Sequence, residues 1–443
     1  MKITEHAQLV GCYSFEERPL DELDALIFSQ LAYLPFEKCI SDNESCTLID
    51  VWHNFTRYNV SEELEPIRKN SYMLLCTCAP LKRYYNVILK DYVSILRKEI
   101  DMQFSATRFV LPGGDEIIAF RGTDTTIAGW KEDANMSYMN VVPAQEESTK
   151  YTQKILSGSN APTYLCGHSK GGNLSLYAGT TVGEDCQAKL VNIFCFDGPG
   201  LTDKLESSEE YIRIIPKIIS IIPQSSVVGL MLNYPPNYKV VKSKAHGLWQ
   251  HDVFTWEISD GKINQKDEVG SMSKITDATL HSWLEERTDD ERKFFVQTLN
   301  AVIDSMDASV VNDVFSDWKG SRKKIGDAID MLPDESKEEM KFLFNDLFKR
   351  GMHETVKNFG EKFSMGKSEK ASENETENCD ASSEVGSETA TEKSESEEKP
   401  KFNEVLKNSM KETVKSFGDK FSMGKPEKAS ENVSAEENET ENC

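Results

Sequence analysis

The sequence predicts an α/β fold with a mostly parallel central sheet, on three observations. A short apolar run, 164–166, leads into a glycine-rich turn, and a helix-compatible run, 172–178, leaves it. The run 190–196 is continuously apolar, which is typical of a strand buried on both faces of a parallel sheet. The chain has 443 residues, 38% of them hydrophobic, which is enough for one large core domain with further segments.

The glycine-rich turn has the pattern of a nucleophile elbow. Gly167 and Gly171 stand two positions before and after Ser169. A sharp turn from strand to helix strains its central residue and leaves room only for small residues at these two positions. The N-terminus of the following helix favours an oxyanion. The sequence therefore predicts an α/β-hydrolase fold with Ser169 as nucleophile, and a glycine-rich turn with an incidental serine is the alternative.

Composition argues against several classes of protein. The formal net charge of −23 speaks against a nucleic-acid partner. No basic segment followed by an apolar run is seen near residue 1, so we expect no signal peptide and a cytoplasmic protein. No apolar run reaches the roughly 20 residues of a membrane span. The ten cysteines are scattered without a histidine cluster at ligand spacing, so we expect no metal and no other cofactor.

Hydrophobic periodicity and turn signals predict the elements in order. Apolar residues recur at helical spacing in 20–34, and acidic residues in its first turn complement the helix dipole. This helix should pack against the sheet. Further helices are expected at 84–97, from about 127 and at 146–156, and strands at 107–111, 116–120, 190–196, 218–222 and 253–258.

The strand 116–120 runs directly into the turn Arg121-Gly-Thr-Asp124. A small turn at the C-terminal end of a buried strand is where an α/β-hydrolase builds half of its oxyanion hole. Thr123 would supply a backbone N–H and its hydroxyl a further donor. Lys170, the residue after the serine, would supply the other backbone N–H. An ordinary β-turn at this place is the alternative.

Asp197 follows the strand 190–196 and is a candidate for the catalytic acid. A carboxylate there is well placed to orient a histidine, although an aspartate also caps turns of the Gly-Pro kind that follows it. The chain order Ser, Asp, His leaves His246 and His251 as candidate bases. The other histidines precede the elbow, lie beside the serine and point elsewhere, or fall in helical segments: His6, His53, His168, His281 and His353.

The chain divides by composition into three parts. Residues 1–265 form the expected hydrolase domain, 266–350 a helical appendage or cap, and 351–443 an acidic tail. Within the tail, 368–401 is rich in Glu, Ser, Thr and Lys and almost free of large apolar residues. Such a segment cannot bury enough surface to offset its chain entropy, so we expect it to be disordered.

The tail carries two closely similar copies of one segment, at 352–374 and 410–432. In each copy the apolar residues fall on a helical stripe beside lysines, which suits a protein partner, a membrane surface or packing on the domain. Gly360 and Gly418 weaken the two helices, so we expect folding on binding. Docking to a partner, or docking of the chain on itself, is the first hypothesis. Membrane contact ranks second because the surrounding residues are acidic.

Several of these residues resemble the class 3 lipase pattern. Phe120-Arg-Gly-Thr-Asp124 with Trp130 and Asp133 resembles the oxyanion turn of that family, and Gly167-His-Ser-Lys-Gly-Gly172 its nucleophile turn. His251 followed by Trp256 is similar to the region around the family's catalytic histidine. The runs 23–33, 196–201, 223–229 and 250–252 resemble more closely a family of lipase-like α/β-hydrolases from Gram-positive bacteria. The resemblance covers about residues 15–265.

One departure from the class 3 pattern concerns the acid. Those lipases carry their catalytic aspartate in the segment that aligns with 223–226, which here reads Pro-Gln-Ser-Ser. The acid has moved to Asp197, as in pancreatic-type lipases, or the triad is incomplete; we favour Asp197. The resemblance implies a serine hydrolase for a carboxylic ester of a lipid or another acyl chain. A thioesterase or peptidase with the same triad, and a hydrolase-fold scaffold whose tail binds a partner, are the alternatives.

Overall fold

The computed structural model describes residues 1–40, 45–124, 127–245, 247–304, 337–340, 342, 343, 346, 349, 350, 353 and 354. The chain divides into two compact units, Met1–Asn300 with Glu339–Thr376, and Ala301–Glu338 with Glu377–Cys443. The sheet and the candidate site lie in the first unit.

The described residues contain a nine-stranded sheet in the order β1-β2-β3-β4-β5-β6-β7-β8-β11. Strands β4 to β8 run parallel to one another, and the pairs nearer the two edges are antiparallel. The mixed α/β class is thus confirmed, with a sheet that is parallel in its centre. The strands are β1 (Cys46–Thr47), β2 (Ile88–Arg97), β3 (Met102–Val110), β4 (Glu116–Phe120), β5 (Thr163–His168), β6 (Leu190–Phe196), β7 (Ile218–Pro223), β8 (Lys239–Val241) and β11 (Gln265–Lys266), with β9 (Ile258–Ser259) and β10 (Lys262–Ile263) in a separate hairpin.

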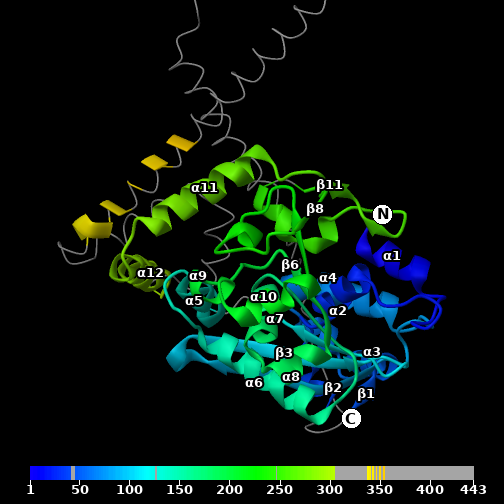
Figure 1. Cartoon of the computed structure of the whole chain (residues 1–443). Coiled ribbons are helices and arrows are strands. Elements are labelled where there is room, and N and C mark those ends of the chain that lie inside the picture. The colour runs from blue at the N-terminus through cyan, green and yellow to red at the C-terminus, as the bar shows by residue number, and fades with distance from the viewer. Residues whose placement is uncertain are drawn as a thin grey trace, which may run out of the picture. The chain divides into compact units, whose positions relative to one another are not determined.

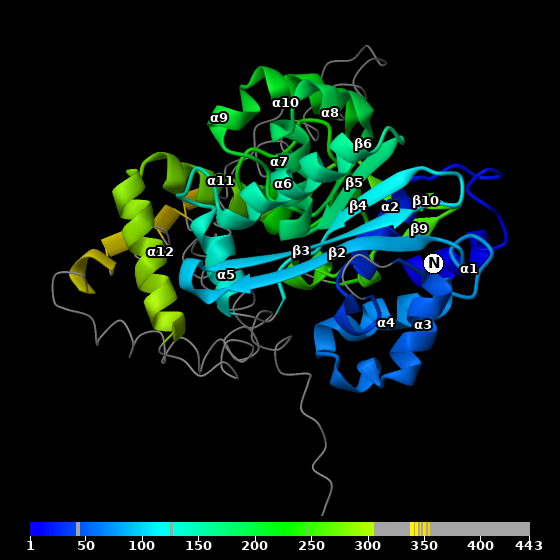
Figure 2. The same cartoon turned by 90° about the horizontal axis from the view of Figure 1, so that it is seen from below.

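Helices cover both faces of the sheet (Figure 1). Figure 2 shows α6, α7, α8 and α10 on one face and α1, α3 and α4 on the other. The helices are α1 (Ile3–Val10), α2 (Glu22–Leu31), α3 (Leu48–Arg57), α4 (Pro66–Cys78), α5 (Ile127–Asn135), α6 (Pro143–Gly158), α7 (Lys170–Thr181), α8 (Glu184–Lys189), α9 (Asp203–Glu206), α10 (Glu209–Ile214), α11 (Ser271–Glu285) and α12 (Asp289–Asp304).

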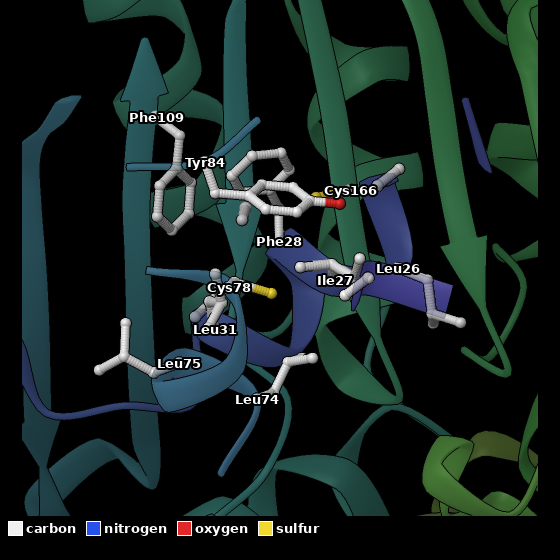
Figure 3. Close-up of a cluster of buried hydrophobic side chains, with 14 of the residues drawn as sticks. Leu26, Ile27, Phe28, Leu31, Leu74, Leu75, Cys78, Tyr84, Phe109 and Cys166 are labelled. Carbon is white, nitrogen blue, oxygen red and sulfur yellow. The ribbon is translucent and has the colours of Figure 1, made fainter. Parts of the chain in front are cut away.

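The side chains of β4 show how the sheet supports two hydrophobic cores. Ile117 and Ala119 belong to the cluster under α1 to α4, whereas Ile118 and Phe120 belong to the cluster under α6, α7 and α10. This alternation follows from the two-residue period of a strand, and it places apolar residues on both faces. Figure 3 shows the first cluster, in which α2 and α4 bring leucine side chains against Phe109 and Cys166 of the sheet.

The helix expected at 20–34 is confirmed as α2. Its N-cap, Asp21, accepts hydrogen bonds from the backbone N–H groups of Leu23 and Asp24. Residues Leu23 to Leu31 are all buried, and the helix packs on β4, β5 and β6. The expected strands at 107–111, 116–120, 190–196 and 218–222 are confirmed as parts of β3, β4, β6 and β7, and the expected helices near 127 and at 146–156 as α5 and α6.

The helix expected at 84–97 is wrong, because residues 88–97 form β2. This strand pairs with β3 in antiparallel fashion, and its register shifts between Lys90 and Val93. Asp91, inside the shift, has a φ of 50°. A bulge of this kind breaks the two-residue alternation, so the apolar residues on either side of it fall at a spacing that resembles a helix.

The strand expected at 253–258 is also wrong. Val253–Thr255 form a 3-10 turn, and the strand β9 starts only at Ile258. Trp256 between them is 2% exposed, and its indole N–H donates to the Gln250 carbonyl at 2.7 Å. The aromatic residue therefore holds a compact loop and does not extend a strand.

Within the helical appendage or cap expected at 266–350, the structure describes the helices α11 and α12. Residues 305–336 of this appendage lie outside the described residues, as do the two repeats apart from His353 and Glu354. Arg350 contacts α11, since its guanidinium donates to the Ser282 carbonyl at 3.2 Å and pairs with Glu286. No helix within the described residues is long and apolar enough to cross a membrane.

Candidate active site

Ser169 occupies the sharp turn between β5 and α7. Its backbone has φ 59° and ψ −132°, a positive-φ conformation that is costly for a residue with a side chain. Its N–H donates to the Phe196 carbonyl at 3.0 Å, and its carbonyl accepts from Gly172 N–H at 2.8 Å. Both bonds fix the strained turn against β6 and the start of α7. The predicted elbow geometry is therefore present in the structure.

The two glycines of the turn are required by close backbone approach. A Cβ at Gly167 would lie 2.1 Å from the Gly171 carbonyl oxygen, and one at Gly171 would lie 2.2 Å from the Phe120 carbonyl oxygen. Unbonded atoms do not approach one another so closely. This steric limit is the reason that small residues were expected two positions before and after the serine.

The side chain of Lys170 faces the interior and not the substrate side. It is 1% exposed, and its ammonium group donates to Glu132 Oε2 at 2.9 Å and to the Gln103 carbonyl and Oε1 at 3.0 and 2.8 Å. Glu132, on α5, is fully buried. This ion pair ties the first residue of α7 to α5 and β3. Only the backbone N–H of Lys170 remains for the role that the sequence assigned to it.

Thr123 lies in the turn after β4, and its hydroxyl is already engaged. The hydroxyl donates to Asp133 Oδ2 at 2.5 Å. Asp133 lies on α5, and burial raises the pKa of its carboxyl group to about 6. While Asp133 is ionised, the Thr123 hydroxyl donates to it and is not free to donate to an oxyanion. The expectation of a second donor from this hydroxyl is therefore not met. The backbone N–H remains the donor to consider.

His251 and Asp197 are joined by a hydrogen bond. Nδ1 of His251 lies 2.6 Å from Asp197 Oδ2. A carboxylate only accepts, so Nδ1 carries the proton, and Nε2 of a neutral ring is left with its lone pair. Asp197 is 1% exposed and His251 is half-buried. The structure thus brings together two residues that lie 54 positions apart in the sequence.

The other oxygen of Asp197 is held by the segment after β7. Oδ1 accepts from the Ser226 hydroxyl at 2.5 Å and from Gly229 N–H at 3.1 Å. These donors satisfy the hydrogen-bonding capacity of Oδ1 and fix the rotation of the buried carboxyl group. Ser226 belongs to the segment 223–226, where the class 3 pattern has its acid. In this chain the segment contributes the Ser226 hydroxyl, which donates to the carboxylate of Asp197, the residue directly after β6.

His168 is placed by the structure in a role that the sequence did not suggest. Its Nε2–H donates to the His251 backbone carbonyl at 2.8 Å, and Nδ1 accepts from the Tyr33 hydroxyl at 3.0 Å. Burial, and then the charge of His251, hold the pKa of His168 well below its ordinary value, so the ring is neutral. The two histidine rings lie 4.5 Å apart. His168 therefore joins the end of β5 to the loop that carries His251.

Tyr33 extends this connection to the oxyanion turn. A Cβ at Gly122 would lie 2.1 Å from the Tyr33 hydroxyl, so the tyrosine packs on the backbone just before Thr123. Burial raises the pKa of this phenol, which keeps it protonated. Tyr33 follows α2, far from the elbow in sequence, and only the run 23–33 noted in the sequence hints at it.

The remaining histidines lie away from these residues or are not described. His6 is in α1, His53 in α3 and His281 in α11, and His353 belongs to a helical segment. His246 lies outside the described residues. Within those residues no group of three His, Cys, Asp or Glu side chains is arranged to hold a metal ion.

A mixed α/β fold with a strained serine between a parallel strand and a helix is typical of lipase-like hydrolases. A family model described as Mbeg1-like matches residues 78–301, about half of the sequence, and the chain belongs to the Mbeg1-like family. The match runs through α11 and into α12, beyond the 15–265 that the sequence resemblance covers.

Comparison with individual proteins adds little. No curated protein matches the chain. Among solved structures, the crystal structure of M37 lipase aligns with 48% of this chain and 69% of its own, at 16% sequence identity and a TM-score of 0.30. A TM-score of that size does not establish a shared fold.

Proposed function

We propose that the protein is a serine hydrolase that cleaves carboxylic esters. The ester is that of a lipid or of another acyl chain. Ser169 is the nucleophile, His251 the general base and acid, and Asp197 the acid that orients the imidazole. The single observation that carries this is the 2.6 Å bond between His251 Nδ1 and Asp197 Oδ2, on loops beside a serine in a strained elbow.

The reaction follows from the tautomer of His251. Its Nε2 takes the proton of the Ser169 hydroxyl as the oxygen attacks the ester carbonyl, and later gives that proton to the leaving alcohol. Asp197 stabilises the imidazolium formed in between. The backbone N–H groups of Thr123 and Lys170 stabilise the oxyanion, aided by the positive end of α7. Water then cleaves the acyl enzyme by the same steps. None of these steps uses a metal or an organic cofactor.

The scaffold alternative rests on the absence of a carboxylate in 223–226. Asp197 already holds His251, and Ser226 of that segment donates to Asp197, so this alternative loses its main support. A thioester or amide substrate would be attacked by the same residues, and no contact favours either over an ester.

A fluorophosphonate probe tests the proposal directly, because it reacts only with an activated serine. The full chain should be labelled and should hydrolyse p-nitrophenyl esters, and Ser169→Ala should lose both activities while keeping its melting temperature. Ser207→Ala, an exposed serine after α9, is the matched control and should behave as the unmodified chain. A Ser169→Ala protein that is still labelled would disprove the proposal.

A further inference from the structure

An apolar cavity of about 190 Å³ lies between the helices α11 and α12 on one side and α5 and the segment 231–232 on the other. Its lining residues lie on α5, the segment 231–232, α11 and the part of α12 up to Val296, and at Pro199, and all of them belong to the first compact unit. Figures 1 and 2 both show α5, α11 and α12 on the same side of the molecule. The side chains that give the cavity its apolar character are Met136, Leu232, Leu280, Leu284, Phe295 and Val296.

Three residues that line the cavity lie next to groups of the proposed catalytic site. Asp133 is one of its lining residues and accepts the Thr123 hydroxyl proton in a hydrogen bond. Pro199, another lining residue, stands two positions after Asp197, and Met231 two positions after Gly229, whose N–H donates to Asp197. The cavity therefore opens beside the oxyanion turn and the loop of the acid.

We propose that this cavity binds the acyl chain of the substrate, and that α11 and α12 set the length of chain that fits. The inference rests on the proposed function and specifies its substrate as an ester of a short to medium fatty acid. Esters of this class place the carbonyl at Ser169 and need a dry, apolar space next to the oxyanion donors for the chain. The charged and hydrogen-bonding groups of the site interact with the ester carbonyl. The surface that lines the cavity is almost entirely apolar, which suits a hydrocarbon chain.

The volume limits the chain length. A dry cavity of about 150 Å³ holds a six-carbon ring in another protein. The present cavity is slightly larger, so it suits an acyl chain of roughly six to eight carbons. Long-chain acids need the several hundred cubic ångströms usual for larger ligands.

The wall formed by α11 is fastened to the core. His281, on α11, lies 3.1 Å from the Leu232 carbonyl through Nε2, and its Nδ1 lies 2.9 Å from Asp277 Oδ1. Gly270, just before α11, donates to the Gln224 carbonyl after β7 at 2.6 Å. The contacts to Leu232 and Gln224 attach the helix on either side of the segment that contains Ser226 and Gly229, which hold Asp197. The cavity wall is thus a fixed part of the site, which chain-length selection requires.

The test is the chain-length profile of p-nitrophenyl esters from acetate to dodecanoate, measured on the full chain. We expect kcat/KM to be highest at six to eight carbons. Leu284→Trp fills the cavity and should lower the ratio of kcat/KM for octanoate to that for acetate about tenfold or more, since each buried methylene is worth about fourfold. Phe295→Ala enlarges the cavity and should move the maximum toward ten or twelve carbons.

Glu285→Trp is the matched control, because it adds the same side chain one position along α11 on the exposed side. Its profile should equal that of the unmodified chain, and melting temperatures confirm that each variant is folded. An unchanged profile in Leu284→Trp and Phe295→Ala, with hydrolysis still dependent on Ser169, would overturn the inference and leave the proposed function intact.

Calorimetric titration of the full chain with octanoate separates the inference from the proposed function. Octanoate should bind to the unmodified chain and to Glu285→Trp, and Leu284→Trp should lose at least tenfold in affinity. If no ester is hydrolysed but octanoate binds in this pattern, the cavity is an acyl site and the catalytic proposal fails. If octanoate does not bind to the unmodified chain, the inference is wrong.

Discussion

Each residue of the candidate site lies on a loop at the carboxyl edge of the parallel strands and is held there by a second polar group. Ser169 is fixed by the Phe196 carbonyl, Asp197 by Ser226, and the His251 backbone by His168. A group that must keep its geometry within a fraction of an ångström needs such support, because loop side chains otherwise sample several rotamers.

His251→Ala should lower kcat for a short-chain ester by a factor on the order of 10³ or more, because the proton of Ser169 then has no acceptor. His246→Ala, the other histidine in the required chain order, should change kcat little. Steady-state kinetics with p-nitrophenyl butyrate measures both. A large loss in His246→Ala with little change in His251→Ala would move the base to residue 246.

Asp197→Asn should reduce kcat by a factor on the order of 10⁴, because the amide donates to His251 and reverses the tautomer. Ser226→Ala should reduce it much less, since Gly229 N–H still holds Oδ1 of the acid. KM should change little in either variant, because neither residue touches the acyl chain. Equal kcat values for Asp197→Asn and the unmodified chain would show that Asp197 only caps its turn.

The sequence indicated some residues of the candidate site and gave no sign of others. Ser169 could be predicted because its turn is local, and Asp197 and His251 followed from chain order, strand ends and the family resemblance. The Ser226 hydroxyl and the His168 ring could not be predicted, because each acts on a residue that only the fold brings near. The Lys170 side chain carried no local sign that it would pair with buried Glu132.

Secondary-structure elements show the same division between local and distant causes. The helix α2 was predictable because its capping residue and its apolar spacing are local signals. Strand β2 was not, since its bulge at Asp91 disguises the strand period and its stability comes from pairing with β3 along nearly its whole length. Pairing partners that are distant in sequence override local propensity.

The attachment of α11 should depend on pH through His281. Its hydrogen bond and ion pair with Asp277 raise the pKa of the imidazole from 6.5 to about 9. The folded protein therefore binds this proton more tightly than the unfolded chain, so the stabilisation is complete below about pH 6.5 and is lost as pH rises through 9.

His281→Gln should accordingly lower the melting temperature at pH 6 and have little effect at pH 10. Thermal unfolding at both values measures the difference. His53→Gln, an exposed histidine on α3, is the control and should show no such pH dependence. A constant difference between the unmodified chain and His281→Gln at both values would mean that the charge on His281 does not contribute.

At the scale of the whole molecule, the sheet and the helices up to Asn300 share one compact unit, together with Glu339–Thr376. The division of the sequence at residue 265 remains a prediction of composition. Met340 and Leu343 are almost fully buried, and Arg350 contacts Ser282 on α11 and Glu286 directly after it. Residues after α12 therefore support the cavity wall, and a deletion that is meant to leave the site intact has to spare them.

Truncation after Thr376 should leave kcat and KM for a hexanoate ester near those of the full chain, because every proposed catalytic and cavity residue lies before it. Truncation after Phe348 removes Arg350 as well and should lower the melting temperature, which makes the pair of truncations a test of where the supporting part ends. If the two repeats are docking elements, truncation after Thr376 removes the second repeat, 410–432, and should weaken recovery of a bound partner. The reason is that two tethered copies raise the effective concentration for the second contact. Loss of hexanoate hydrolysis in the Thr376 truncation would show instead that 377–443 acts on the catalytic unit, and the docking hypothesis would be abandoned.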